Sequence, residues 1–256
     1  MTTPPEPRSE RILRLLENEE QLSVRDLADR VGVSEVTVRK DLDALSRRSL
    51  IERVRGGARL RAAGEGPLAL RLGHHAAAKR AIAKRAAELV DPGSVIALDS
   101  SSTAYYLALE LADRADATIV TNSLRVASQL GEQSDLDVVL LGGSLRRTSF
   151  STVGFPPELL HGYGRIDSAF LGVSGLSADA GLRERSFAEA ETKRALAGAA
   201  ARTVALFDSS KAAGFGQHQV LPASEVHRLI TDDAFPDADA WRRAGAIVDS
   251  VPIPGS

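Results

Sequence analysis

The stretch from Ser34 to Leu42 combines hydroxyl, methyl and cationic side chains at a spacing suited to reading DNA. Ser34 is a residue type that caps helices, and apolar residues recur at helical spacing after it. The apolar face of the predicted helix comprises Val38, Leu42 and Leu45. The opposite face and its flanks comprise Val36, Thr37, Arg39, Lys40 and Arg47. Asp41 is expected to turn toward the domain interior and pair there. Such a helix can enter a major groove, although a surface helix with solvated charges shows the same pattern.

In residues 50–58, the apolar Ile51 and Val54 are interleaved with charged side chains and followed by two glycines, which predicts a small hairpin, or wing. Its Arg53 and Arg55 could contact the phosphate backbone. Positive charge is concentrated in this part of the chain, because residues 34–61 hold 8 Lys and Arg against 4 Asp and Glu, while the whole chain has a net charge of −2. The predicted DNA-binding residues are Ser34, Val36, Thr37, Arg39, Lys40, Arg47, Arg53 and Arg55.

Polar residues follow most of the predicted strands in the second half of the chain, beginning with residues 99–103. The carboxyl ends of parallel strands share one edge of the sheet, where ligands bind in open α/β folds. Hydroxyls and backbone N–H groups at a helix start favour a phosphate, and Lys211 would add a positive charge. The predicted effector-binding residues are Asp99, Ser100, Ser101, Ser102, Thr103, Thr121, Asn122, Gly142, Gly143, Asp208 and Lys211.

In any single loop, the same residue types are common as helix caps and turn formers without a ligand. Five or six such loops together with a lysine favour a site for a small phosphorylated polyol. Asp99, Glu189, Glu191 and Lys193 are candidate acid–base groups, but no spacing among them specifies a general base. The last three are expected on a helix surface or lining the ligand pocket, and no catalytic residue is predicted.

Two kinds of domain are needed to position these side chains. Apolar spacing predicts helices over residues 8–18 and 23–32, which with the helix after Ser34 and the wing form a winged helix-turn-helix. In the second half, the predicted strands are 95–98, 117–120, 138–141, 169–172, 204–207, 229–230 and 246–248. A predicted helix at 79–90 precedes these strands, and the predicted helices that alternate with them are 103–112, 123–132, 156–163, 186–201 and 236–244. This alternation predicts an α/β fold whose mostly parallel sheet is covered by helices on both faces.

The expected segments are a disordered lead at 1–7, a DNA-binding domain at 8–59, a linker at 60–75, an effector-binding domain at 76–251 and a tail at 252–256. His74 and His75 are expected to be solvated linker residues, because no other potential metal ligands cluster nearby. The absence of cysteine excludes disulfides and thiolate metal sites. We see no apolar signal region or membrane span, and expect a cytoplasmic protein without metal or cofactor.

The run Ser34-x-x-Thr37-Val38-Arg39-Lys40-Asp41-Leu42 resembles the signature of the DeoR family of bacterial transcriptional regulators. Arg8, Ile12 and Leu16 stand at the family's spacing before it, and Gly56-Gly57-Ala58 resembles the end of the family's wing. Val54-Arg55 stands where a Thr-His pair is common. This combination is far more specific than a generic helix-turn-helix pattern.

The resemblance extends through the second half, including Leu98-Asp99-Ser100 and Asp208-Ser209-Ser210-Lys211. It implies a sensor domain similar in fold to ribose-5-phosphate isomerase and glucosamine-6-phosphate deaminase. It also implies a sugar-phosphate effector held by the first βα loop, with Lys211 near the phosphate. Ser101 stands where the family commonly has Gly, and would be strained if that position needed a positive φ.

The combined pattern predicts a homo-oligomeric, DNA-binding repressor of a carbohydrate operon, controlled by a phosphorylated sugar and not itself an enzyme. One alternative is a sugar-phosphate isomerase or deaminase-like enzyme with an N-terminal DNA-binding appendage. Another is a regulator whose sensor no longer binds a ligand. The sequence identifies neither the sugar nor the operator.

Overall fold

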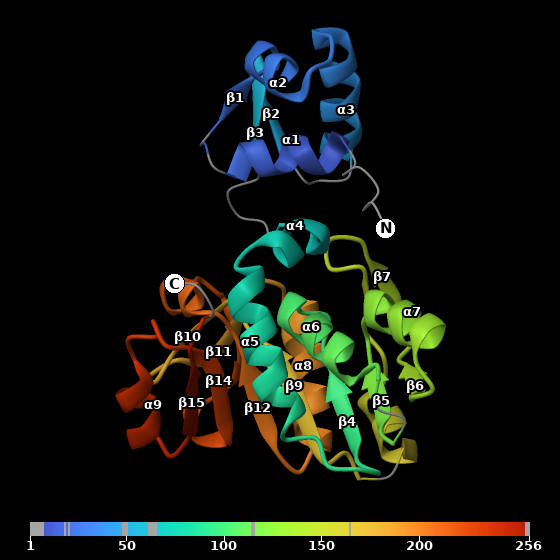
Figure 1. The fold of residues 1–256 in the computed structure, drawn as a ribbon, viewed down its shortest axis with the longest axis vertical. Coiled ribbons are helices and arrows are strands. Elements are labelled where there is room, and N and C mark those ends of the chain that lie inside the picture. Colours follow the sequence, from blue (N-terminus) through green and yellow to red (C-terminus); the bar gives the residue numbers. More distant parts are fainter. Residues whose placement is uncertain are drawn as a thin grey trace. The chain divides into compact units, whose positions relative to one another are not determined.

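In the computed structural model, the chain forms two compact units, Met1–His74 and His75–Ser256 (Figure 1). The structure describes residues 8–17, 19, 21–47, 51–60, 66–113, 116–163 and 165–253. The predicted lead at 1–7 lies outside the described residues, as do 61–65 of the predicted linker and 254–256 of the predicted tail.

The first unit is a helix-turn-helix followed by a hairpin. Ser23 caps its second helix by accepting the Asp26 N–H at 3.0 Å, and Gly32 ends that helix with a φ of +75°. The three strands form an antiparallel sheet in the order β1-β3-β2. The elements are α1 (Arg8–Glu17), β1 (Leu22–Ser23), α2 (Val24–Val31), α3 (Glu35–Arg47), β2 (Ile51–Val54), β3 (Gly57–Leu60) and α4 (Leu68–Gly73).

Helix α4 lies within the predicted linker but belongs to the core of the first unit. Leu70 of α4 is 5% exposed and shares one apolar cluster with Leu16, Leu27 and Leu42. Burial of a leucine side chain contributes about 1.5–3 kcal/mol. The apolar core therefore continues past the wing as far as α4.

The second unit is built on a seven-stranded sheet in which every neighbouring pair is parallel. The strand order is β15-β14-β12-β9-β4-β5-β6. The strands are β4 (Val95–Leu98), β5 (Thr118–Thr121), β6 (Asp137–Leu140), β9 (Ser168–Gly172), β12 (Thr203–Leu206), β14 (Arg228–Asp232) and β15 (Ile247–Val251). All seven match predicted strands to within a few residues.

Helices cover both faces of this sheet, as predicted (Figure 1). One face is covered by α5 (Ala76–Ala87), α6 (Ser102–Leu111) and α7 (Leu124–Gln133). The other is covered by α8 (Phe187–Ala199), α9 (Ala238–Arg243) and the 3₁₀ helix η1 (Pro157–Tyr163). Trp241 of α9, the one tryptophan of the chain, is fully buried on this second face.

Alternate strand residues face opposite helical layers. Ile96 and Leu98 pack with the α5–α7 layer, whereas Ala97 between them packs with the α8 layer. The two layers exclude water from the five inner strands, which explains why these strands are nearly continuous apolar runs, whereas the edge strands β6 and β15 are partly exposed. The predicted α/β fold class is confirmed.

In the second unit, the short antiparallel strands outside the main sheet were not predicted. Hairpin β7 (Ser144–Arg146) and β8 (Ser151–Val153) follows β6. A second small sheet consists of β10 (Gly175–Ser177), β11 (Gly181–Glu184) and β13 (His218–Leu221). The remaining 3₁₀ turns are η2 (Ser209–Ala213) and η3 (Ala223–Glu225). These strands have three or four residues and carry polar side chains, so they lack the apolar runs that marked the main sheet.

Candidate functional site

Helix α3 has one buried and one exposed face. Val38, Leu42 and Leu45 are at most 1% exposed, whereas Val36 is 60% exposed. Ser34 caps the helix, since its hydroxyl oxygen accepts the Thr37 N–H at 3.2 Å and lies 2.9 Å from the Thr37 hydroxyl. The helix is therefore anchored by its apolar face, and its opposite face is open to solvent.

The cations of this face lie at the surface. Lys40 is exposed, and Arg39 pairs with Glu35 one turn earlier at 2.9 Å. An exposed pair of this kind contributes little net stability, so the guanidinium can exchange Glu35 for another anion. The side chain of Arg47 lies outside the part that the structure describes.

Asp41 forms an internal ion pair, as predicted. Arg8 of α1 donates Nε to Asp41 Oδ2 at 2.6 Å and Nη2 to Oδ1 at 3.0 Å. This two-pronged geometry is the strong form of an arginine–carboxylate contact, and it ties α1 to α3. The contact with the carboxylate raises the pKa of the Arg8 guanidinium.

The wing presents its two predicted arginines differently. Arg55 is exposed at the turn between β2 and β3, next to Gly56, whose φ is +80°. Arg53 forms an ion pair with Asp43 of α3. Arg55 can meet a phosphate directly, whereas Arg53 must first give up, or share, its contact with Asp43.

The loop between β4 and α6 is held from within. Asp99 is fully buried, and its two oxygens accept the N–H of Ser101 at 2.9 Å and the N–H of Gly172 at 2.8 Å. Ser100, Ser102 and Thr103 are also buried. The predicted loop residues therefore lie together at the carboxyl edge of β4.

Ser101 is not strained in this loop. Its φ is −74°, and its hydroxyl oxygen caps α6 by accepting the Ala104 N–H at 3.1 Å. The position therefore does not need a positive φ. The glycine that the packing requires is Gly172, because a Cβ there would lie 2.3 Å from the Ser101 Cβ.

Thr121 and Asn122 are fully buried at the end of β5. The Thr121 hydroxyl donates to the Leu98 carbonyl at 2.7 Å and accepts the Ser123 N–H at 3.0 Å. Asn122 donates Nδ2 to the Thr152 carbonyl at 2.9 Å, while no described residue donates a hydrogen bond to its Oδ1. Asn122 thus retains one buried acceptor, which is costly without a partner.

The remaining predicted effector residues lie after β6 and β12. Gly142 and Gly143 are exposed, and Gly143 has a φ of +128° at the base of the β7–β8 hairpin. Asp208 is buried and accepts the Ser210 hydroxyl, while Lys211 is half-buried in η2. A Cβ on Gly143 would lie 2.4 Å from the Val153 carbonyl, so this glycine is needed to close the hairpin.

A buried lysine on α8 joins three segments at this edge. Lys193 is 3% exposed, and its Nζ lies 2.9 Å from Asp99 Oδ2 and 2.6 Å from Glu184 Oε1. It also donates to the Gly172 carbonyl at 2.7 Å. Burial alone lowers the pKa of Lys193, but the nearby carboxylates outweigh burial and raise it above its ordinary value.

Glu184 is one of the two carboxylates that contact the Lys193 ammonium. Burial alone raises the pKa of Glu184, but the Lys193 ammonium, the Ser174 hydroxyl and the Arg185 N–H lower it overall. The Ser174 hydroxyl donates at 2.6 Å. Glu184 and Lys193 therefore form a buried, hydrogen-bonded ion pair.

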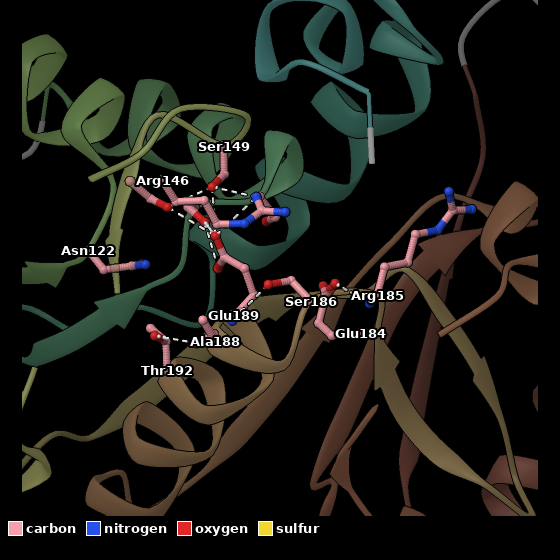
Figure 2. A network of polar contacts seen from close by, with 12 residues as sticks. Asn122, Arg146, Ser149, Glu184, Arg185, Ser186, Ala188, Glu189 and Thr192 are labelled. Atoms are coloured by element: carbon pink, nitrogen blue, oxygen red, sulfur yellow. Dashed lines mark hydrogen bonds and ion pairs between the residues drawn. The ribbon is translucent and has the colours of Figure 1, made fainter. Parts of the chain in front are cut away.

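Glu189, one turn before Lys193, collects hydroxyl donors from two loops (Figure 2). Ser100 donates at 3.1 Å, Ser149 at 2.6 Å and Ser151 at 3.0 Å. Arg146 of β7 lies 3.5 Å from Glu189 Oε1 and donates to the Ser149 hydroxyl at 2.8 Å. The carboxylate thus connects α8 to the β4–α6 loop and to the β7–β8 hairpin.

Lys193 and Glu189 were not among the predicted site residues. Both were expected on a helix surface or lining a pocket, and only Glu191 is on the surface, where it pairs with Arg194. The available signal was helical spacing, since Glu189 and Lys193 share a face with the buried Leu196.

Other kinds of site find no support in the described part of the chain. It contains no group of three His, Cys, Asp or Glu side chains that could hold a metal ion, and His74 and His75 are exposed. None of its helices is long and apolar enough to cross a membrane.

Solved structures resemble part of this chain only distantly. A ribose 5-phosphate isomerase A from Methanocaldococcus jannaschii is 23% identical, with a TM-score of 0.39 over 52% of each chain. A transcriptional regulator from Streptococcus pneumoniae TIGR4 is 12% identical, with a TM-score of 0.41 over 65% of this chain and 86% of that one. Likeness at this level does not assign a function.

Curated relatives match nearly the whole chain. GlpR of Haloferax volcanii is 34% identical over 92% of both chains, and GolR of Listeria innocua is 33% identical over 90% of this chain and 91% of that one. The glycerol-3-phosphate regulon repressor of Escherichia coli K12 is 30% identical over 89% of this chain and 88% of its own.

Two family descriptions match the two units in turn. The DeoR-like helix-turn-helix domain matches residues 8–62, and the DeoR C terminal sensor domain matches residues 74–233. The chain therefore belongs to the DeoR family of DNA-binding transcriptional regulators.

Proposed function

We propose that this regulator is a repressor of a carbohydrate operon and that a small phosphorylated sugar controls its binding to DNA. The observation that carries the DNA-binding part is the two-faced helix α3, with Val36 60% exposed and Val38 fully buried. A helix anchored by its apolar face offers its other side to the major groove as a rigid surface.

The roles on α3 follow from chemistry and exposure. Arg39 and Lys40 can donate to base edges or to nearby phosphates, the Thr37 hydroxyl can do either, and Val36 can contact a thymine methyl. Arg55 and Arg53 of the wing would hold the phosphate backbone without reading sequence. Half-sites in operators are usually paired, so a homo-oligomer follows from this mode of binding.

The proposed effector site is the carboxyl edge of the sensor sheet. Ser100, Ser102 and Thr103 lie at the start of α6, where backbone N–H groups favour an anion. Asn122 adds a buried carbonyl oxygen without a described donor, which suits a sugar hydroxyl. Lys211 would supply a positive charge for the phosphate.

The names of the relatives support the same class of effector. One relative is named as the repressor of a glycerol-3-phosphate regulon, and glycerol 3-phosphate is a phosphorylated polyol. To shift the regulator off DNA, such a ligand must bind one arrangement of the sensor better than the other.

The test begins with selection of an operator from random duplex DNA by the full-length protein. Phosphorylated sugars and polyols are then screened by thermal shift, with their unphosphorylated forms as matched controls. We expect at least one phosphorylated compound to raise the melting temperature and to release the selected DNA in a gel-shift titration. Failure of every phosphorylated compound to do both would overturn the proposed control.

A further inference from the structure

The carboxylate of Glu189 is surrounded by hydroxyl donors and lies near one guanidinium group. Glu189 is 2% exposed, and its hydroxyl donors Ser100, Ser149 and Ser151 are likewise buried. Ser100 belongs to the β4–α6 loop, where the effector phosphate is proposed to bind. A single carboxylate therefore uses donors that a phosphate in the same loop would also need.

Arg146 makes only a long contact with the Glu189 carboxylate. Its Nη1 lies 3.5 Å from Glu189 Oε1, well beyond the short, two-pronged contact that arginine makes with an anion of matching shape. Its side chain is 19% exposed, so the guanidinium is not sealed into the core. The Ser100 hydroxyl also makes long hydrogen bonds to Glu189, at 3.1 and 3.3 Å from its two carboxylate oxygens.

We propose that Glu189 is an internal substitute for the effector's phosphate group. In the empty sensor it engages Ser100 and Arg146, and the phosphate displaces it from these two partners on binding. A phosphate carries about −1.5 to −2 charges and three acceptor oxygens, so it competes well for a guanidinium fork. The inference rests on the proposed function, because it takes a phosphorylated ligand at this edge.

The exchange leaves no buried carboxylate without donors. After Ser100 and Arg146 turn to the phosphate, Glu189 keeps the Ser149 and Ser151 hydroxyls, at 2.6 and 3.0 Å. The positive charge of Lys193 also acts on it. The exchange changes the contact of the β7–β8 hairpin with α8, because Arg146 is part of β7. Ligand binding and hairpin position are thereby coupled.

This competition has a measurable consequence. Glu189→Gln keeps the shape of the side chain but removes the charge that holds Arg146 and repels a phosphate. The affinity for inorganic phosphate should therefore rise by about tenfold, the size of one charge-assisted hydrogen bond. Arg146→Gln should lower it by about as much.

The full-length protein is titrated calorimetrically with inorganic phosphate, and each variant is first shown to unfold cooperatively. Glu191→Gln is the matched control, because Glu191 is exposed on the same helix. The double variant Glu189→Gln/Arg146→Gln should lose the gain seen in Glu189→Gln alone.

The outcomes separate the two proposals. If Glu189→Gln binds phosphate no more tightly than Glu191→Gln, Glu189 only connects loops and the inference is wrong. If the wild type also fails to bind any phosphorylated sugar of the effector screen, the proposed function falls with it. If the wild type binds a phosphorylated sugar while Glu189→Gln gains nothing, only the inference falls.

Discussion

Arg39 on α3 and Lys193 on α8 are both cations paired with carboxylates, but their surroundings differ. The Arg39 side chain is 57% exposed and has one partner, Glu35. The Lys193 side chain is 4% exposed and contacts two carboxylates and a backbone carbonyl. Replacing Glu35 by a DNA phosphate as the partner of Arg39 requires little free energy, because the pair is exposed. Removing a partner from the buried Lys193 cluster strongly destabilises the fold.

This difference separates two ways of binding. The face of α3 can meet its partner with little internal rearrangement, because its polar groups are solvated. At the carboxyl edge of the sensor, most polar groups already have partners inside the protein. A ligand there must exchange partners with the protein, and that exchange is what can change the arrangement of loops.

Removal of the buried cation should give the largest effect. Lys193→Met leaves Asp99 and Glu184 facing each other without a counter-charge, and we expect a loss of about 3–5 kcal/mol in the free energy of unfolding. Urea denaturation of the full-length protein measures it. Arg194→Met is the control on the next residue, whose exposed pair should be worth about 1 kcal/mol or less. Equal losses in both variants would contradict the contrast between buried and exposed pairs.

Acid should weaken the same cluster. The folded-state pKa of Glu184 lies below its unfolded value. At pH values between these two pKa values, the unfolded chain therefore binds more protons than the folded protein. The stabilisation is complete above the ordinary glutamate pKa, roughly 4.3, and is lost as the pH falls through the folded pKa. One group contributes a slope of at most about 1.4 kcal/mol per pH unit.

Glu184→Gln should remove this part of the pH dependence, whereas Glu191→Gln should leave it in place. The measurement is the free energy of unfolding in urea as a function of pH. An unchanged acid slope in Glu184→Gln would show that Glu184 is not the group responsible.

On the DNA side, Arg39→Ala should weaken operator binding by about tenfold or more, the value of a base contact of roughly 1–3 kcal/mol. Stability and phosphate affinity should stay the same, because Arg39 contacts only an exposed carboxylate. A gel-shift titration with the selected operator measures the change. Arg30→Ala on α2 is the control, since Arg30 is exposed and paired with Glu19. Unaltered operator affinity in Arg39→Ala would refute its role.

The smallest effect is expected at Ser101. Ser101→Ala removes the oxygen that caps α6 and should cost about 1 kcal/mol, whereas Ser101→Gly should cost only a few tenths. Thermal denaturation compares the two variants. A clear gain in stability for Ser101→Gly would mean that the loop is strained after all.

The sequence was most informative where a pattern spans a whole element. The exposed and buried faces of α3 could be predicted because Val38, Leu42 and Leu45 recur at helical spacing. The five inner strands of the parallel sheet could be predicted because both of their faces are buried. Helix α4 was missed, since Leu68 and Leu70 are too few to define a periodic pattern.

The polar networks of the sensor were predictable only in part. Asp99 and Ser100 were identified because they directly follow a strand. Glu189 and Lys193 resemble the solvated charges of a surface helix, and their partners come from loops distant in sequence. Arg146 gave no signal, because it lies on a hairpin of two three-residue strands.

Trp241 makes the two units spectroscopically distinct. The tryptophan and all three tyrosines of the chain, Tyr105, Tyr106 and Tyr163, lie after residue 74, as do all seven phenylalanines. Trp241 is fully buried, so its fluorescence should shift to the red when the sensor unfolds. The DNA-binding unit contributes no aromatic signal, and its unfolding should be visible only in the peptide circular dichroism. The natural protein therefore carries a reporter for one unit and none for the other.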